Sequence, residues 1–278
     1  MDTKLVPGRK RLSTSTSAVR QNLDDRSRGA AVVTGGRRGI GRAAAIELAK
    51  FGFNVCVLDV VEDEASEITV AGLAGYPVKS KFLRTDISDL SSHTEVIDDI
   101  SEELGPITCL VNNAGIQVSK RGDLLDVSAR TFDHLIGVNL RGTFFFTQAI
   151  AQRMLRDRSD HCSIITVTSS NAVLVSPEKG PYCISKAALS MANSLFAVRL
   201  AADDIPVFEI RPGLIRTDMT EPVRDHYTKA IEDGLSPVRR WGEPEEVGRV
   251  VASLATGALP FTTGEIINVG GGLQIARL

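Results

Sequence analysis

Features that would assign this chain to several other protein classes are scarce or missing. Its 278 residues include only four cysteines, Cys56, Cys109, Cys162 and Cys183, and none of them has a CxxC or metal-ligand spacing. The sequence therefore predicts no disulfide framework and no metal site, and thiols in apolar runs suit a reducing compartment such as the cytoplasm. The formal net charge of −2 leaves no basic excess for nucleic acid or an anionic membrane. No apolar run approaches the roughly 20 residues that are needed to cross a bilayer.

The first 28 residues differ in composition from the rest of the chain. They are rich in Ser, Thr, Arg and Lys, and they show no apolar periodicity. We expect residues 1–28 to form a disordered, solvated leader. A targeting peptide remains an alternative, although a hydrophobic segment of the secretory type is missing. Residues 29–278 are sufficient for a single α/β domain with a substantial core.

Short apolar runs alternate with amphipathic stretches from Gly29 onward. The expected strands are Ala30–Thr34, Asn54–Asp59, Val78–Thr85, Ile107–Val111, Ser163–Thr168, Pro206–Ile210 and Glu265–Val269. The expected helices are Ile40–Phe51, Asp63–Ala74, Ser92–Leu104, Thr131 to about Arg156 and Pro181–Ala201, with a loop and short helices between Thr217 and Ala255. This alternation indicates a parallel sheet with helices on both faces, which binds ligands at the carboxyl ends of its strands.

A glycine-rich turn, Thr34–Gly41 with the sequence TGGRRGIG, joins the first expected strand to the first helix. Glycines permit a tight turn and let the backbone approach a pyrophosphate, while the helix N-terminus supplies unpaired N–H groups. The spacing is GxxxGxG, which differs from the more usual GxGxxG. Its position between a strand and a helix nevertheless indicates a nucleotide site.

Asp59 ends the second expected strand and bears on the choice of nucleotide. A carboxylate there can accept hydrogen bonds from both hydroxyls of an adenosine ribose and would repel a 2′-phosphate, which favours NAD(H). Arg37 and Arg38 oppose this preference, because a guanidinium beside the ribose could bind that phosphate. We favour NAD(H) on the strength of Asp59 and keep NADP(H) or dual use as alternatives. A solvated loop charge is the other interpretation of Arg37.

Further polar residues follow the next strands. Asp86, before Ile87, could accept a hydrogen bond from the adenine amino group, or could be a turn or N-cap residue. The run Asn112–Gly115, with the sequence NNAG, could border the adenosine and its ribose. Asn139 lies inside an apolar helical stretch, where an amide needs a hydrogen-bond partner. It could satisfy neighbouring backbone, or hold a water and bend the helix toward the site.

Tyr182 and Lys186 are four residues apart, so on a helix they share one face. A nearby ammonium favours the phenolate, so we expect Lys186 to lower the pKa of Tyr182 from its usual value of about 10. Ser169 lies thirteen residues before the tyrosine, at the end of an apolar run. Taken alone, the YxxxK spacing could arise by chance on a solvated helix.

Taken together and in this order, these motifs resemble the short-chain dehydrogenase/reductase family over about residues 29–274. The resemblance implies a Rossmann-type, doubly wound sheet of about seven strands in a three-layer sandwich, a nicotinamide cofactor and a homotetramer. It implies that Tyr182 is the general acid and base, that Ser169 rather than Ser170 holds the reacting oxygen, and that Asn139 anchors a proton-relay water. Lys186 would bind the nicotinamide ribose. The implied cofactor residues are Gly35, Arg37, Arg38, Gly39, Ile40, Gly41, Asp59, Asp86, Ile87, Asn113, Ala114, Gly115, Tyr182, Lys186, Pro212, Gly213, Ile215 and Thr217.

The substrate is less defined than the reaction. Gln117, Asn171, Ser176 and Glu178 could provide a polar wall suited to a small hydroxylated or carbonyl compound. The stretch Asp218–Val238 is predicted to form a lid lined by His226 and Tyr227, although a surface histidine is the simpler interpretation of His226.

Two alternative functions remain on the sequence alone. The run Arg240–Val247 resembles 3-oxoacyl-carrier-protein reductases, but Asp160 and Asp203 occupy places where those enzymes present basic residues to an acidic carrier, despite Arg156 and Arg158 nearby. The other alternative is a non-catalytic NAD sensor, which would have no need of Ser169, Tyr182 and Lys186 together.

Overall fold

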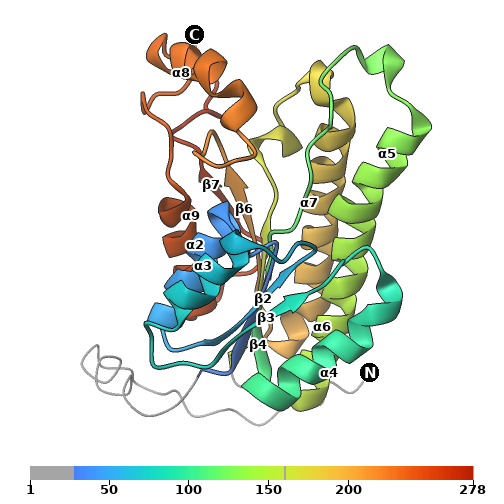
Figure 1. Cartoon of the computed structure of the whole chain (residues 1–278), viewed down its shortest axis with the longest axis vertical. Helices are drawn as coiled ribbons and strands as arrows, with labels where there is room; N and C mark the ends of the chain where they lie inside the picture. The colour runs from blue at the N-terminus through green and yellow to red at the C-terminus, as the bar shows by residue number, and fades with distance from the viewer. Residues whose placement is uncertain (1–27, 160, 278) are drawn as a thin grey trace, which may run out of the picture.

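A parallel sheet runs through the centre of the computed structural model, which describes residues 28–159 and 161–277 (Figure 1). Its strand order is β3-β2-β1-β4-β5-β6-β7. The strands are β1 Ala30–Thr34, β2 Asn54–Asp59, β3 Ser80–Arg84, β4 Ile107–Asn112, β5 Ser163–Val167, β6 Val207–Pro212 and β7 Ile266–Val269. The strand order reverses between β1 and β4, and this point in a doubly wound sheet is where ligands bind. The predicted Rossmann-type sheet of seven strands is confirmed.

Helices cover both faces of the sheet (Figure 1). One layer contains α2 Gly39–Lys50, α3 Glu64–Leu73 and α9 Pro244–Ala255. The opposite layer contains α4 His93–Leu104, α5 Ala129–Ile136, α6 Thr143–Asp157 and α7 Gly180–Leu200, while α8 Arg224–Glu232 lies at the top of the view. None of the helices in the described part of the chain is long and apolar enough to cross a membrane.

Alternate side chains of β1 explain why this strand has no polar face. Ala31 and Val33 belong to the core beneath α2 and α9, whereas Ala30 and Val32 belong to the core beneath α4 and α6. Successive residues of a strand point to opposite faces, so a strand covered on both sides is apolar throughout. Burial on both faces places β1 in the centre of the sheet. Its carboxyl end lies at the point where the strand order reverses, which is where ligands bind in such sheets.

Two helices differ from the sequence expectation. The long helix expected from Thr131 to about Arg156 is interrupted by a π-helical segment at Gly137–Gly142, between α5 and α6. The region expected to hold a loop and short helices includes α9, a helix of 12 residues whose Gly248 packs closely on α2, where a Cβ would lie 2.7 Å from the Ala43 carbonyl oxygen. The first difference is a wider helical turn, which hydrophobic periodicity does not reveal.

The expected leader lies outside the described residues, except for Arg28. Arg28 is part of the folded structure, because its backbone N–H donates to the Gly52 carbonyl and its own carbonyl accepts from Thr108 Oγ1 at 2.6 Å. Three of the four cysteines, Cys56, Cys109 and Cys162, are buried as free thiols.

Candidate active site

Two adjoining pockets follow the carboxyl ends of the strands. The nucleotide pocket has a volume of about 500 Å³ and extends from the glycine-rich turn past Asp59 to Asn113. The catalytic pocket has a volume of about 140 Å³ and contains Ser169 and Tyr182. Ile40, Asn113, Gly115, Thr217 and Met219 line both pockets, so the two form one continuous site.

The glycine-rich turn is packed too tightly for side chains. Gly35 has φ of 64°, in the left-handed region that glycine adopts readily. A Cβ at Gly41 would lie 2.2 Å from the Gly35 carbonyl oxygen, which no real Cβ could tolerate. The N-cap of α2, Arg38, makes no side-chain capping bond, so the first N–H groups of this helix have no side-chain partner at the cap. This backbone arrangement suits a pyrophosphate, which accepts hydrogen bonds from a helix N-terminus.

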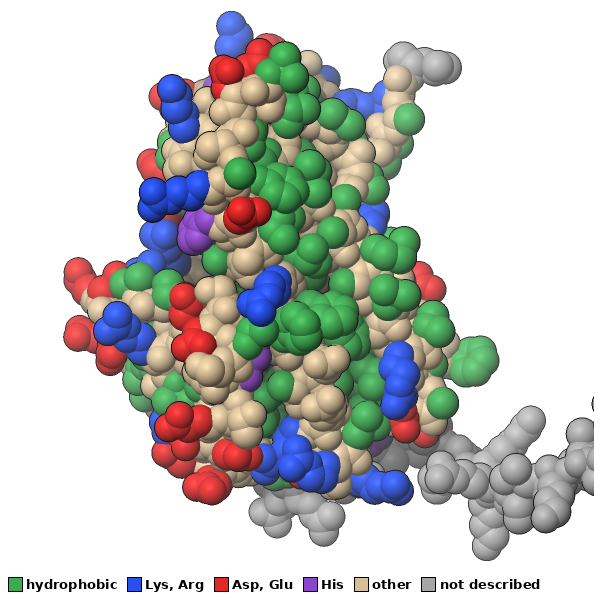
Figure 2. Space-filling model, turned by 90° about the vertical axis from the view of Figure 1, so that its right-hand side faces the viewer, with side chains coloured by type: hydrophobic (Ala, Val, Ile, Leu, Met, Phe, Trp, Pro, Cys, Tyr) green, Lys and Arg blue, Asp and Glu red, His purple; other side chains and the backbone are tan. Residues whose placement is uncertain are grey.

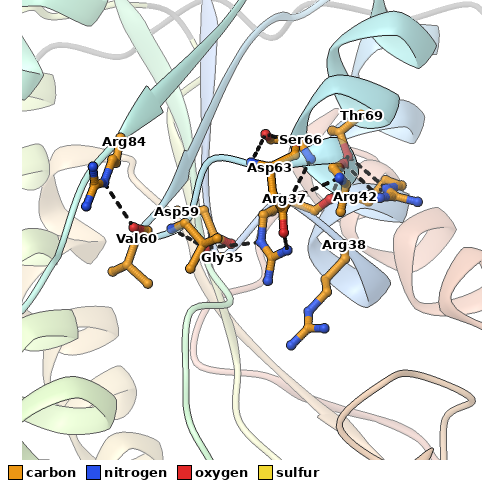
Figure 3. Close-up of polar contacts among 12 residues, drawn as sticks. Gly35, Arg37, Arg38, Arg42, Asp59, Val60, Asp63, Ser66, Thr69 and Arg84 are labelled. Carbon is orange, nitrogen blue, oxygen red and sulfur yellow. Dashed lines mark hydrogen bonds and ion pairs between the residues drawn. The ribbon is translucent and has the colours of Figure 1, made fainter.

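An ion-pair cluster lies at the carboxyl end of β2 (Figure 3). Arg37 Nε is 3.5 Å from an Asp59 carboxylate oxygen, and Arg37 Nη1 is 2.5 Å from Asp63, which caps α3. The Asp59 carboxylate also accepts a hydrogen bond from the Val61 N–H at 3.3 Å. The Arg37 hydrogen bond holds the pKa of Asp63 below its usual range. The guanidinium of Arg37 is therefore already bound to two carboxylates.

Two further arginines near this cluster, Arg38 and Arg84, also have protein partners. Arg38 points away from Arg37 in Figure 3 and pairs with Asp218 at 2.7 Å, in an exposed contact. Arg84, opposite Asp59 in the β2–β3 register, donates from Nε to the Val60 carbonyl at 3.3 Å. Arg84 was not predicted, and only the strand register reveals that it is a neighbour of Asp59.

Asn113 holds the glycine-rich turn against β4. Its side-chain amide donates to the Gly35 carbonyl at 2.8 Å, and its backbone N–H donates to Thr34 Oγ1 at 3.0 Å. Asp86 lines the nucleotide pocket, and it also accepts hydrogen bonds from both the N–H and the hydroxyl of Ser88. The turn role and the pocket position of Asp86 are thus compatible.

Ser169 and Tyr182 reach the catalytic pocket from different elements. β5 ends at Val167, and Thr168 separates it from Ser169. Ser169 caps a short 3-10 helix, and its Oγ accepts a hydrogen bond from the Asn171 N–H at 3.1 Å. Tyr182 lies in the first turn of α7 and is 7% exposed. Burial raises the pKa of Tyr182 above its usual value, and the neighbouring Ser169 hydroxyl acts in the opposite direction.

Lys186 lies one turn after Tyr182, with its Nζ 5.8 Å from the tyrosine ring centroid and 3.2 Å from the Val167 carbonyl oxygen, to which it donates. Burial lowers the pKa of Lys186 to about 8, and the buried carboxylate of Glu209 acts in the opposite direction. The expectation that Lys186 leaves Tyr182 with a lowered pKa is therefore wrong for this structure. Burial disfavours the charged form of each side chain, the phenolate of Tyr182 and the ammonium of Lys186.

The π-helical segment directs Asn139 toward α7. Asn139 is fully buried, accepts from the Ile116 N–H at 2.8 Å, and donates to the Ile116 carbonyl and to Ser185 Oγ at 2.9 and 3.1 Å. A Cβ at Gly115 would lie 3.3 Å from both Asn139 Oδ1 and Lys186 Nζ. The amide of Asn139 and the ammonium of Lys186 thus flank Gly115 at the junction of the two pockets. Single π-helical turns inside α-helices are frequent at functional sites.

The structure places most of the predicted site residues at these pockets. The nucleotide pocket is lined by Gly35, Arg37, Arg38, Gly39, Ile40, Asp59, Asp86, Ile87, Asn113, Ala114, Gly115 and Thr217. The catalytic pocket is lined by Ser169, Ser170, Tyr182, Lys186, Pro212, Gly213, Ile215, Thr217, Gln117, Asn171 and Tyr227. Gly41 and Asn139 line neither pocket.

Three predicted substrate residues, Ser176, Glu178 and His226, do not line the catalytic pocket. Glu178 and His226 are both exposed, and His226 packs edge-on against the ring of Tyr227. Arg121, Lys179, Met219 and Val223 line the pocket and were not predicted. They lie in loops or short helices, where no periodicity indicates which way a side chain points.

A dinucleotide fits the two pockets. The glycine cradle excludes a Cβ, Asp59 lies at one end, and Tyr182 and Lys186 lie at the other. Arg37 Nε makes no hydrogen bond, and it lies 3.5 Å from an Asp59 carboxylate oxygen at the edge of this pocket. Within residues 28–159 and 161–277, no group of His, Cys, Asp or Glu side chains could hold a metal ion.

Comparison with known proteins assigns the family. Residues 35–274 match the family model described as enoyl-(acyl carrier protein) reductase. A crystal structure of a short-chain type dehydrogenase/reductase from Mycobacterium marinum is 31% identical, with a TM-score of 0.84 over 92% of this chain and 99% of that one. The chain belongs to the short-chain dehydrogenase/reductase family. It is accordingly an oxidoreductase of a family whose members bind NAD or NADP.

Several similar members of this family carry more specific names. A 3-oxoacyl-[acyl-carrier-protein] reductase of Staphylococcus epidermidis is 32% identical over 88% of this chain and 98% of its own. A crystal structure of a 3-oxoacyl-[acyl-carrier protein] reductase from Brucella melitensis in complex with NAD is 45% identical, with a TM-score of 0.86, and covers 91% of this chain and 100% of that one. A putative 2-deoxy-D-gluconate 3-dehydrogenase from Agrobacterium tumefaciens with bound NADP is 29% identical, with a TM-score of 0.80, and covers 91% and 99%.

Proposed function

We propose that this dehydrogenase/reductase interconverts a secondary alcohol and a ketone of a small substrate, with Tyr182 as the general acid and base. The observation that carries the proposal is the position of Ser169, Tyr182 and Lys186 in one small pocket that opens into the nucleotide pocket. A nicotinamide nucleotide bound there would supply or accept the hydride. The protein would orient the substrate and handle the proton.

Each side chain has a distinct task in this proposal. Tyr182 gives its hydroxyl proton to the carbonyl oxygen during reduction and takes the alcohol proton during oxidation. Ser169 donates a hydrogen bond to the same oxygen and stabilises its developing negative charge. Lys186 binds the nicotinamide ribose, and Asn139 anchors a water that connects the lysine to solvent. Burial of Tyr182 keeps the hydroxyl protonated at neutral pH, which suits its role as an acid.

We further propose NAD(H) as the preferred cofactor. Asp59 offers its carboxylate to the ribose hydroxyls, and the guanidinium that could bind a 2′-phosphate, Arg37, is held by Asp59 and Asp63. Arg38 is held by Asp218. The relatives with bound NAD and with bound NADP show that the family uses both nucleotides, so the local charges are what support the preference.

A panel of alcohols, polyols and ketones tests the reaction and the cofactor together. Each compound is incubated with the full-length protein and either NAD(H) or NADP(H), and nicotinamide absorbance reports turnover. Turnover of a secondary alcohol or ketone with NAD(H) supports the proposal, and a strong preference for NADP(H) contradicts the cofactor assignment. Tight NADH binding without turnover of any compound would favour the non-catalytic sensor instead.

The names of the similar proteins favour a second candidate, a 3-oxoacyl-carrier-protein reductase. Docking of an acidic carrier requires a basic surface near the pocket. At one of the two expected docking positions, Asp203 carries a negative charge and pairs with Arg199 at 2.8 Å in an exposed contact, so Arg199 is not a free positive charge for a carrier. The other position, Asp160, lies outside the described residues. Turnover of acetoacetyl-carrier-protein far faster than of free ketones would establish this candidate over the first.

We also propose a homotetramer and a cytoplasmic location. Hydrophobic side chains gather across the face of the molecule that carries α5, α6 and α7 (Figure 2). Exposed large side chains of these helices include Phe145, Ile184, Met191, Leu195 and Val198. Burial of such a surface between subunits would remove it from water. Analytical ultracentrifugation tests the assembly, and a monomer at micromolar concentration would contradict it.

The proposed cytoplasmic location rests on the cysteines. Free, buried thiols are consistent with a reducing compartment.

A further inference from the structure

The ammonium group of Lys179 has no counter-ion in the catalytic pocket. Lys179 is 8% exposed, yet it lines the pocket, with its Nζ 5.8 Å from the centroid of the Tyr182 ring. Within the part of the chain that the structure describes, this ammonium makes no hydrogen bond and no ion pair. The side chain is thus largely buried while its ammonium group, without a protein partner, faces the pocket beside the tyrosine, where a bound anion could pair with it.

A second cation, Arg121, lies beside Lys179 at the same pocket. The backbone of the two loops is joined by a hydrogen bond from the Gly122 N–H to the Glu178 carbonyl at 3.2 Å. The Arg121 guanidinium packs over the ring of Tyr227, 5.9 Å from its centroid. Its nearest acidic group is Glu178 at 3.9 Å, and the Glu178 side chain is 66% exposed, so this pair is weak.

The charge of the pocket lining is entirely positive. Arg121, Lys179 and Lys186 line the pocket, and no Asp or Glu among the described residues does so. Burial lowers the pKa of Lys179, and repulsion from Arg121 lowers it further. Bound negative charge would relieve both effects, because an opposite charge nearby favours the ammonium form.

We propose that Lys179 and Arg121 form a carboxylate-binding site, and that the substrate is a small oxo acid or the corresponding hydroxy acid. With its carbonyl between Ser169 and Tyr182, such a molecule would extend its carboxylate toward Lys179, which adjoins the tyrosine ring. Lys179 and Arg121 would thus determine which ketones and alcohols are bound.

This inference rests on the proposed alcohol–ketone reaction, and matched substrates separate the two. Pyruvate, acetoacetate and levulinate are compared with their methyl esters, with acetoacetyl-CoA and with dihydroxyacetone phosphate, using NADH. We expect at least one acid to exceed its ester in kcat/KM by about tenfold or more. Lys179→Met should reduce this ratio by about tenfold or more, mainly through KM, because the uncharged ester loses no ion pair.

Two further variants serve as controls. Lys179→Arg keeps the charge and should retain the preference for the acid. Lys120→Met makes the same change in the same loop as Arg121, but Lys120 is exposed and does not line the pocket, so the acid-to-ester ratio should not change.

Several results would overturn the carboxylate site. If esters are reduced as well as the acids, or if Lys179→Met leaves the ratio unchanged, the site is wrong while the proposed reaction stands. A strong preference for the phosphate or for the coenzyme A thioester would also overturn it. If no ketone is reduced, the proposed reaction fails, and calorimetric titration of the same acids into the protein–NADH complex decides the site. Binding that Lys179→Met weakens would support the site, and absence of binding would reject it.

Discussion

Arg37 Nε lies 3.5 Å from a carboxylate oxygen of Asp59, at the mouth of the nucleotide pocket. Asp63 binds the same guanidinium from the other side, so the arginine that could attract a 2′-phosphate is neutralised by two carboxylates. This nitrogen of Arg37 still lacks a hydrogen bond. Both residues line the nucleotide pocket, and the paired guanidinium adds no unpaired positive charge to it there.

Asp59→Asn should shift the cofactor preference toward NADPH. The change removes the charge that repels a 2′-phosphate and leaves Arg37 with only one carboxylate partner. We expect the ratio of kcat/KM for NADPH to that for NADH to rise by about 10- to 100-fold. Steady-state kinetics with both cofactors measure this ratio. Glu62→Gln is the control, because Glu62 is exposed and does not line the pocket. An unchanged ratio in Asp59→Asn would show that the carboxylate does not select the nucleotide.

Tyr182→Phe should abolish proton transfer but keep the pocket shape. General acid–base groups contribute about 10²- to 10⁴-fold to a rate, so we expect kcat to fall by about that factor. The dissociation constant for NADH, measured by fluorescence titration, should change little. Tyr76→Phe is a matched control, because Tyr76 packs against the core beneath α2, away from the pockets. Near-normal turnover in Tyr182→Phe would rule out the assigned role.

Lys186→Met should stabilise the free protein while destroying its activity. Burial lowers the pKa of Lys186 from 10.5 to about 8, so the unfolded chain binds the proton more tightly than the folded one. The resulting penalty of about 3 kcal/mol is fully present below pH 8 and is relieved as the pH rises toward 10.5. The hydrogen bond to Val167 offsets part of this penalty.

Urea unfolding of the wild type and of Lys186→Met at about pH 7 and about pH 10 tests this linkage. The advantage of the variant in free energy of unfolding should be largest at the lower pH and should shrink at the higher one. A variant that is less stable at both pH values, with no change in the difference, would show that Lys186 is not held in a state of depressed pKa.

Gly41→Ala should destroy the nucleotide site, whereas Gly137→Ala should be tolerated. A Cβ at Gly41 would lie 2.2 Å from the Gly35 carbonyl oxygen, so the backbone of the turn would have to move. A Cβ at Gly137 would meet nothing within 4 Å. We expect Gly41→Ala to lose about 100-fold or more in NADH affinity, and Gly137→Ala to match the wild type. Fluorescence titration with NADH compares the two, and equal affinities would contradict the tight turn.

Much of the fold follows from local sequence patterns. The doubly buried strands and the amphipathic helices repeat with periods that are visible along the chain, and the order of motifs identifies the carboxyl edge of the sheet as the site. The positions of Ser169, Tyr182 and Lys186 were predicted because strand ends and helix turns constrain where their side chains lie. The π-helical segment around Asn139 escaped prediction, because one wider turn hardly changes the apolar pattern.

The charges of the site depended on the tertiary structure. Arg37 pairs with Asp63, which is 26 positions away along the chain, and Arg38 pairs with Asp218, which is 180 positions away. No local sequence pattern predicts such pairs. The raised pKa of Tyr182 results from burial, which the spacing to Lys186 does not reveal. Lys179 is in sequence only a charge beside Glu178, and the packing of two loops makes it a buried cation facing the reacting tyrosine. The sequence by itself thus determined the fold and the class of reaction, because these depend on periodicity and on the order of motifs. Only the tertiary structure decided which charges are paired and which remain free for a ligand, because that depends on side chains brought together from distant segments.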